Sequence, residues 1–224
     1  MRCTGAIAIA VAVLAAGTLR AADTSRNWET AFPIKSAPER VHFRAHYFDE
    51  RGRAHALEVW RDSNLRLRRK TDDRLELYVE KSSSGEYEYR LIDRSRNVLI
   101  RAQRPSLFRI GMFPDWTGLA HVLNVPSGEY RVTGTARQSP ASLRGDCAWQ
   151  RLEVLGPAPM PVEICWSAAW GLPWQIDFAN RAGETKPRFS LDEVATFEPA
   201  PGLFEPNGAG FVELDADQDG ELSD

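Results

Sequence analysis

Residues 41–60, VHFRAHYFDERGRAHALEVW, decide the fold because apolar and polar side chains alternate on both sides of one short turn. Alternation with a period of two is the pattern of a half-buried β-strand. Apolar residues on one face and the opposite charges of Arg44 and Glu58 favour the same hairpin register. That register pairs Phe48 with Ala54, Tyr47 with His55, Ala45 with Leu57, Arg44 with Glu58 and Phe43 with Val59.

The same alternation recurs along the chain between short turn clusters, and short turns favour pairing between neighbouring strands. Further strands are expected at 65–70, 75–80, 87–93, 98–102, 129–135, 147–155, 162–168, 174–179 and 188–197. A sheet of this size must curl or be covered on one face. The sequence therefore predicts a mainly β fold, with a single large curved antiparallel sheet that forms an incomplete barrel.

A stretch of different character interrupts the strands after Pro105. Residues 106–112 are compatible with a short helix, and Asp115 is a typical N-cap for a second helix over 116–123. The second helix would place apolar side chains on one face, namely Trp116, Leu119, Ala120 and Leu123. We expect this helical insertion to form a lid over the sheet.

Composition excludes two broad classes of protein. The chain has 224 residues, of which 43% are hydrophobic, so it can bury a core and does not have the composition of a disordered protein. Its 28 basic and 31 acidic residues nearly balance, which argues against a nucleic-acid partner. The length suits one large domain with a small appendage, and we expect a monomer.

The first 22 residues contain no acid and are typical of a secretory signal. Arg2 supplies the positive start, residues 5–19 the apolar stretch, and Ala21 and Ala22 the small residues for cleavage. We expect a signal peptide at 1–21 and a periplasmic protein, with an uncleaved anchor as the alternative.

Cleavage would remove Cys3 and leave Cys147 and Cys165 as an even pair in an oxidising compartment. Such a pair favours a disulfide. Two buried thiols and a catalytic cysteine are the alternatives.

The C-terminal stretch has two parts. Residues 198–210 contain three Pro and three Gly and are typical of a linker. The pattern D-x-D-x-D-G-x-L-S then resembles the opening of an EF-hand calcium loop. The candidate metal ligands are Asp215, Asp217, Asp219, Glu221 and Ser223, although the chain ends at Asp224, before the acidic position twelve. Calcium is therefore a candidate ligand, although we expect no cofactor to be required. The alternative is that this segment is a solvated acidic tail without a bound metal.

Three stretches carry a resemblance to a known family: LEVWRDSNLRLRRK with LELYVEK, then RPSLFRIGMFPDWTGLAHVL, then GLPWQIDFANRAGETKPRFSLDEVATFEPAPGLFEP. Together they resemble the periplasmic lipoprotein carriers of the LolA and LolB kind. The resemblance implies a β domain over 22–200, followed by the tail 201–224, with helices that cap a cavity for acyl chains. The pair of cysteines, the short segment 22–36 and the acidic tail depart from the family pattern.

A concave sheet face can bind an apolar ligand by removing its surface from water. The candidate lining residues are Phe43, Leu57, Val59, Leu65, Leu67, Leu77, Val79, Tyr87 and Tyr89, with Trp116 and Leu119 on the lid. Ordinary core packing is the alternative for all of them. The expected partner is a hydrophobic small molecule, a lipid or an acylated protein. The basic strand with Arg66 and Arg68 is a candidate for peripheral contact with a membrane.

The sequence contains no nucleophile elbow, phosphate loop or dinucleotide fingerprint. His42 and His46 share a strand face and His55 faces the other way, which argues against a zinc site. We therefore expect a non-enzymatic carrier or binding protein. A calcium-dependent interaction protein and a hydrolase with an unidentified site in the cleft are the alternatives.

Overall fold

The computed structural model describes residues 25–49, 51–103, 115–135, 137, 147–155, 161–179 and 185–218. The expected signal peptide 1–21, the expected helix 106–112 and the end of the acidic tail lie outside these residues. No helix of the described segments is long and apolar enough to cross a membrane.

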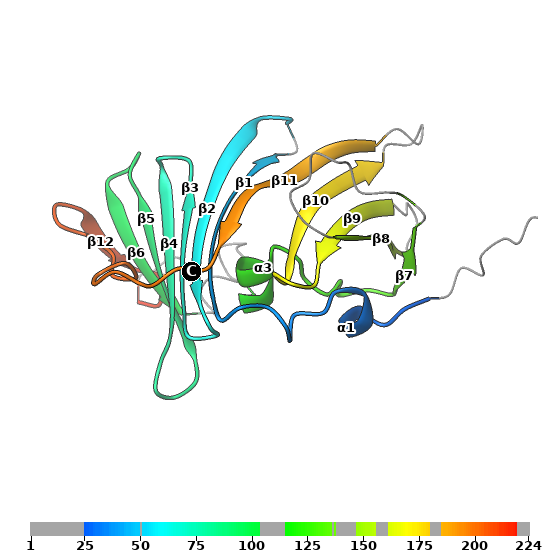
Figure 1. The fold of residues 1–224 in the computed structure, drawn as a ribbon. Helices are drawn as coiled ribbons and strands as arrows, with labels where there is room; N and C mark the ends of the chain where they lie inside the picture. The colour runs from blue at the N-terminus through cyan, green and yellow to red at the C-terminus, as the bar shows by residue number, and fades with distance from the viewer. Residues whose placement is uncertain are drawn as a thin grey trace, which may run out of the picture.

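The described residues form one curved sheet of twelve strands that does not close into a barrel (Figure 1). The strands are β1 (Arg40–Phe48), β2 (Ala54–Asp62), β3 (Arg66–Thr71), β4 (Leu75–Lys81), β5 (Tyr87–Asp93), β6 (Val98–Gln103), β7 (Tyr130–Gly134), β8 (Ala148–Val154), β9 (Pro161–Ser167), β10 (Leu172–Ala179), β11 (Thr185–Ala195) and β12 (Val212–Asp215). Their order is β12-β6-β5-β4-β3-β2-β1-β11-β10-β9-β8-β7. The predicted fold class is confirmed.

The hairpin of β1 and β2 has the predicted register throughout. Phe43 lies opposite Val59, Arg44 opposite Glu58, and Tyr47 opposite His55, whose rings stack 5.1 Å apart. The apolar face of this hairpin is buried, with Phe43 and Val59 at most 1% exposed. The predicted pattern therefore fixes which face of the sheet meets the core.

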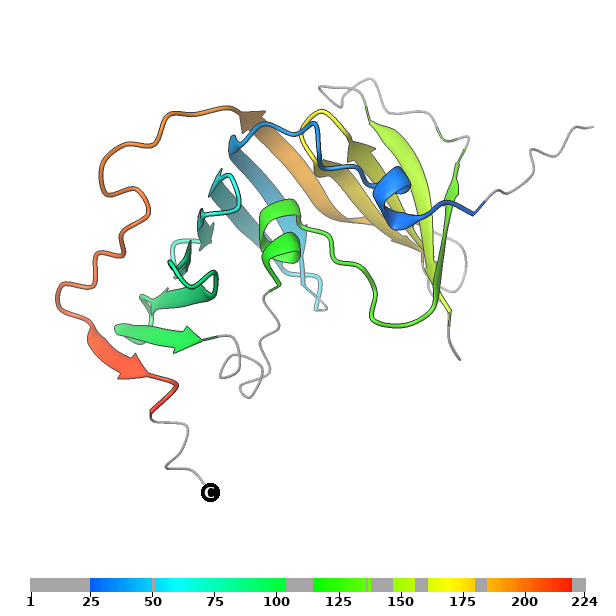
Figure 2. The same ribbon diagram turned by 90° about the horizontal axis from the view of Figure 1, so that it is seen from below.

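Two short helices, α1 (Trp28–Ala31) and α3 (Trp116–His121), lie on the concave side of the sheet (Figure 2). Helix α3 begins after Asp115, as predicted, although the Asp115 side chain makes no capping hydrogen bond. Leu119 and Ala120 of α3 join the main core cluster together with side chains of the concave face. The two helices thus cover part of the concave face, and α1 lies against the edge strand β7, where Trp28 contacts Tyr130.

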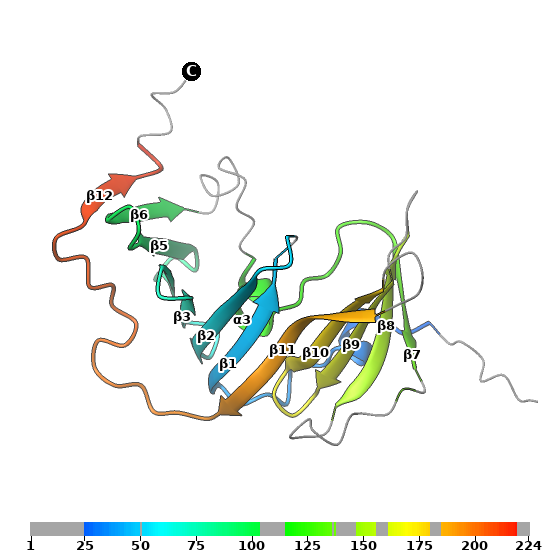
Figure 3. The same cartoon turned by 90° about the horizontal axis from the view of Figure 1, so that it is seen from above.

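The segment after β11 packs back on the sheet, although its Pro and Gly content predicts a linker. It runs along the outside of the sheet to β12 (Figure 3). Phe204 is buried and lies beneath the Arg66 guanidinium, 4.8 Å from the ring centroid. Phe211 packs on a small cluster made of Tyr78, Ile92 and Leu99. Strand β12 then pairs with β6 in parallel, unlike the antiparallel pairs elsewhere in the sheet.

Candidate functional site

An apolar pocket of about 470 Å³ lies between the segment around α1 and the segment around α3. Trp166 of β9 contributes to its wall, and its indole nitrogen donates to the Pro33 carbonyl at 3.1 Å. Ile34 and Val125 also line the pocket and are 41% and 52% exposed. Large exposed apolar side chains beside an apolar hollow are typical of a binding site.

The wall on the side of α1 is built by local capping and aromatic packing. Asn27 caps the helix, since its side-chain oxygen accepts from the Thr30 amide at 2.8 Å. Trp28 then packs on Phe32, 4.6 Å away between ring centroids, and Phe32 packs edge-on against Trp166 at 5.4 Å. These contacts hold a very short helix against the sheet and so position this wall of the pocket.

Most of the lining residues predicted from the sequence lie together in the main core. Leu65 is the exception, because it lies in the turn between β2 and β3 and is 49% exposed. Tyr87 and Trp116 lie at the edge of the core. The buried members are Phe43, Leu57, Val59, Leu67, Leu77, Val79, Tyr89 and Leu119. None of the predicted residues lines the pocket between α1 and α3.

A second pocket, of about 420 Å³, adjoins the first and contains a buried cation. Arg61 of β2 is 3% exposed and lines this second pocket. Its guanidinium donates from Nη1 to the Ala120 carbonyl at 3.2 Å and from Nη2 to the Pro38 carbonyl at 3.0 Å. Burial lowers the pKa of Arg61 to about 10, so the group still carries its charge at neutral pH.

His121 lies next to Arg61 and lines both pockets. Burial, and then the neighbouring Arg61 charge, lower the pKa of His121 to about 4. The imidazole is therefore neutral near pH 7. Nδ1 of His121 lies 2.8 Å from the Gly171 carbonyl and 2.9 Å from Nη1 of Arg61, and Nε2 lies 3.4 Å from the same Nη1. The tautomer protonated at Nδ1 donates to Gly171 and accepts from Arg61 through Nε2, whereas the tautomer protonated at Nε2 accepts from Arg61 through Nδ1.

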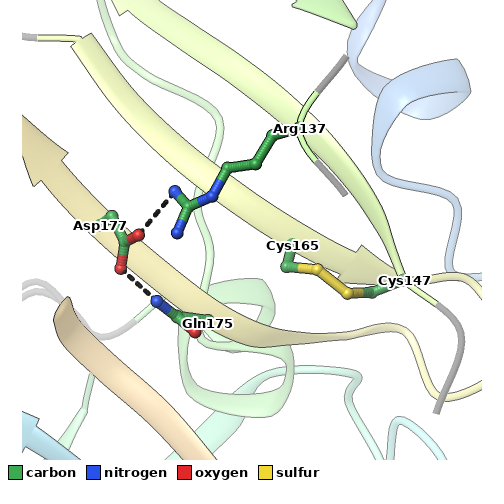
Figure 4. The surroundings of a disulfide bond; sticks show 5 residues. All are labelled: Arg137, Cys147, Cys165, Gln175 and Asp177. Atoms are coloured by element: carbon green, nitrogen blue, oxygen red, sulfur yellow. Dashed lines mark hydrogen bonds and ion pairs between the residues drawn. A yellow bond between two sulfur atoms is a disulfide. The ribbon is translucent and has the colours of Figure 1, made fainter. Parts of the chain in front are cut away.

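The predicted disulfide between Cys147 and Cys165 is confirmed, with the two Cα atoms 5.3 Å apart. Figure 4 shows a polar group beside it. Arg137 donates to one carboxylate oxygen of the buried Asp177, and the Gln175 amide donates to the other, both at 2.7 Å. Because both carboxylate oxygens are engaged, the group fits a structural role better than a catalytic one.

The other polar candidates do not converge within the described residues. His42, His46 and His55 contact different carboxylates, those of Glu58, Asp192 and Asp72 respectively. No group of three or more metal-ligating side chains occurs in this part of the chain.

Two of the candidate calcium ligands can be placed. Both carboxylate oxygens of Asp217 accept hydrogen bonds from the backbone amide of Gln103, at 3.0 and 3.1 Å. The backbone amide of Asp217 donates to the Asp215 carboxylate. Asp219, Glu221 and Ser223 lie outside the described residues.

Sequence reasoning missed the pocket wall formed by residues 28–35. The available signal was weak, since it consists of Asn27 at a capping position followed by Trp28 and Phe32 at helical spacing. Arg61 was also missed as a concave-face residue. The predicted hairpin register places it on the same face as Val59, so that signal was strong.

Comparison with known proteins supports the fold only. No protein-family model matches the chain, and no curated protein matches it. An uncharacterized conserved protein from Thermus thermophilus has a similar structure, with a TM-score of 0.51 and 10% identity, covering 84% of this chain and 95% of that one. MucB gives a lower TM-score of 0.42, with 16% identity, covering 83% of this chain and 64% of MucB. MucB in complex with MucA(peri) gives a TM-score of 0.40 and 16% identity, with coverages of 83% and 60%.

Proposed function

We propose that this protein is an exported, non-enzymatic binding protein that takes up an apolar group. The ligand is a hydrophobic small molecule, a lipid, or the acyl chain of a modified partner protein, and it occupies the pocket between α1 and α3. The observation that supports this proposal is the apolar pocket of about 470 Å³ with Ile34 and Val125 exposed beside it. Each Å² of apolar surface removed from water contributes about 25 cal/mol, so a long chain needs no polar anchor to bind.

The lining residues predicted from the sequence adjoin this pocket through α3. Leu119 of α3 belongs to the same core cluster as Phe43 and Val59. Because α3 contributes residues both to the pocket and to this cluster, a ligand longer than the pocket would extend towards the cluster past α3. We therefore assign the first contacts of the ligand to the pocket itself, and a deeper contact with the predicted wall to the longest ligands.

Export is supported by the disulfide, because such bonds persist in oxidising compartments. Together with the signal pattern of residues 1–21, it favours a periplasmic location. We propose that the mature protein acts there as a monomer.

Native mass spectrometry of the purified mature protein, combined with titration of an apolar fluorescent dye, tests the function. We expect co-purified lipid or dye binding that decreases at least tenfold when Ile34→Glu and Val125→Glu are combined. Val212→Glu with Leu214→Glu is the matched control, because these exposed apolar residues lie on β12 and outside the pocket. Absence of both lipid and dye binding in the folded protein would overturn the proposal.

Calcium binding by the C-terminal segment remains a separate prediction. It requires a calcium adduct in the same spectra that disappears when the chain is truncated before Asp215. The alternative of a hydrolase with its site in the cleft has no nominated residue.

A further inference from the structure

Arg61 is a buried cation, and the binding of an apolar group does not require one. It projects from β2 on the concave face, whereas the adjacent Asp62 belongs to the opposite face and pairs with Arg40 and Arg66. Burying a guanidinium is costly unless an opposite charge or good hydrogen bonds compensate for it. The partners of Arg61 therefore indicate whether its charge is compensated within the protein.

The partners of Arg61 among the described residues are all neutral. They are the carbonyls of Ala120 and Pro38 and the imidazole of His121. These partners engage Nη1 and Nη2, and none of the hydrogen bonds of Arg61 found in the described part of the chain involves Nε. No acidic side chain in this part of the chain forms an ion pair with Arg61, and residues 104–114, which precede α3, contain no acid.

The surroundings of Arg61 form a small polar pocket next to a larger apolar one. Ser63, Asn64 and Thr117 line the second pocket with Arg61 and supply further hydrogen-bonding groups. Glu39 also lines it but is exposed, and it is not among the partners of Arg61 given above. The two pockets share Ile34, Thr117 and His121, so they are direct neighbours.

We propose that Arg61 binds the anionic head group of a single-chain amphiphile whose apolar chain lies in the pocket between α1 and α3. This inference rests on the proposed function and names its ligand class. A carboxylate or a phosphate would supply the negative counter-charge that Arg61 lacks among the described residues. Charge-assisted hydrogen bonds to guanidinium groups are among the strongest in proteins. Both head groups share this chemistry, because each presents two or more acceptor oxygens to the same donors.

The test compares ligands that have the same chain length but different head groups. Calorimetry at pH 7.5, below the micelle concentration, measures the binding of decanoate, decyl phosphate, decanol and decyltrimethylammonium to the mature protein. We expect the better of the two anions to bind at least tenfold more tightly than decanol, and the cation to bind more weakly than decanol. The anion that binds more tightly identifies the source, a fatty acid for the carboxylate and a lipid head group for the phosphate.

Variants then assign the effect to Arg61. Arg61→Met should remove the preference for the anion while leaving decanol affinity within about threefold, and Arg61→Lys should retain part of the preference. Arg44→Met is the matched control, since Arg44 is an exposed arginine on the opposite face, paired with Glu193. Because Arg61→Met also removes contacts with α3, circular dichroism establishes that the variant is folded.

The outcomes separate the two proposals. Equal affinity of the unmodified protein for decanol and both anions would overturn the role of Arg61 and leave the apolar pocket intact. An anion preference that survives in folded Arg61→Met would also overturn it. Failure of all four ligands and of the apolar dye would overturn the proposed function itself. The comparison of head groups in the unmodified protein remains decisive even if Arg61→Met does not fold.

Discussion

Trp116 stacks on Tyr87, with ring centroids 5.0 Å apart and ring planes 12° from parallel. Trp116 is the first residue of α3 and Tyr87 the first residue of β5, so the stack joins the short helix to the sheet. A helix of six residues is not stable alone in water. Its position therefore depends on contacts such as this one.

Replacing Trp116 should loosen α3. Trp116→Ala removes the stack and its buried area, and we expect the free energy of unfolding to fall by about 2 kcal/mol. Amide hydrogen exchange in residues 116–121 should increase more than exchange in β8 and β9. Trp116→Phe keeps an aromatic partner for Tyr87, so its free energy of unfolding should fall by less than half as much as that of Trp116→Ala. Equal exchange in α3 for all three proteins would contradict the role of the stack.

Removing the disulfide should destabilise the protein without changing the fold. The bond closes a loop across a sequence separation of 18, which corresponds to about 3 kcal/mol of stability. The double substitution Cys147→Ser with Cys165→Ser should lower the urea midpoint accordingly. Reduction of the unmodified protein should raise its mass by about 2 Da, since two thiols replace one disulfide. An unchanged mass would show that the isolated protein holds two free thiols.

Phe204 should anchor the C-terminal segment to the outside of the sheet. It is 8% exposed, lies beneath Arg66 and is 6.4 Å from Phe197 between ring centroids. Phe204→Ala should lower the free energy of unfolding by about 3 kcal/mol and increase amide hydrogen exchange in β12. Phe178→Ala is the matched control, because Phe178 is 38% exposed and should cost less than about 1 kcal/mol. Equal effects of the two substitutions would mean that the segment is only loosely attached.

Local patterns were sufficient to predict the sheet. The alternation in β1 and β2 predicted their register because shifting one strand by one residue would expose Phe43 and Val59. Strand β5 was predicted with its bounds, Tyr87–Asp93, since turn residues flank a clear alternation on both sides. The start of α3 was predicted from Asp115 and the apolar spacing that follows it. In each case the decisive interactions are close in sequence.

The parts that were missed depend on contacts between distant segments. Strand β12 has four residues, and its pairing with β6 is stabilised by Phe204 and Phe211 packing on the sheet. The apolar pocket requires the residues around α1 to meet those after α3, which are about 90 positions away along the chain. Neither contact produces a periodic pattern. The sequence therefore predicted an apolar binding face but not which residues stay exposed on it.

Glu76 should make the protein sensitive to acid. Its side chain is 2% exposed and accepts from Arg68 and Tyr78 at 2.7 Å and from Nε of Arg94 at 2.9 Å. Burial alone would raise the pKa of Glu76, but the hydrogen bonds from Arg94, Tyr78 and Arg68 outweigh it and lower the pKa from 4.5 to about 2. Because the folded pKa is below the unfolded value, ionised Glu76 stabilises the fold above pH 4.5, and this stabilisation is lost as the pH falls towards 2.

Unfolding in urea between pH 7 and pH 2.5 measures this loss. We expect Glu76→Gln to lower the free energy of unfolding by about 3 kcal/mol at pH 7, because Arg68 and Arg94 lose the carboxylate that they share. The variant should also lose less stability than the unmodified protein when the pH falls from 4.5 to 2.5. Glu213→Gln is the matched control, since Glu213 is 56% exposed in its pair with Arg101 and should change stability by less than about 1 kcal/mol. An unaltered pH dependence in Glu76→Gln would assign the acid sensitivity to other carboxylates.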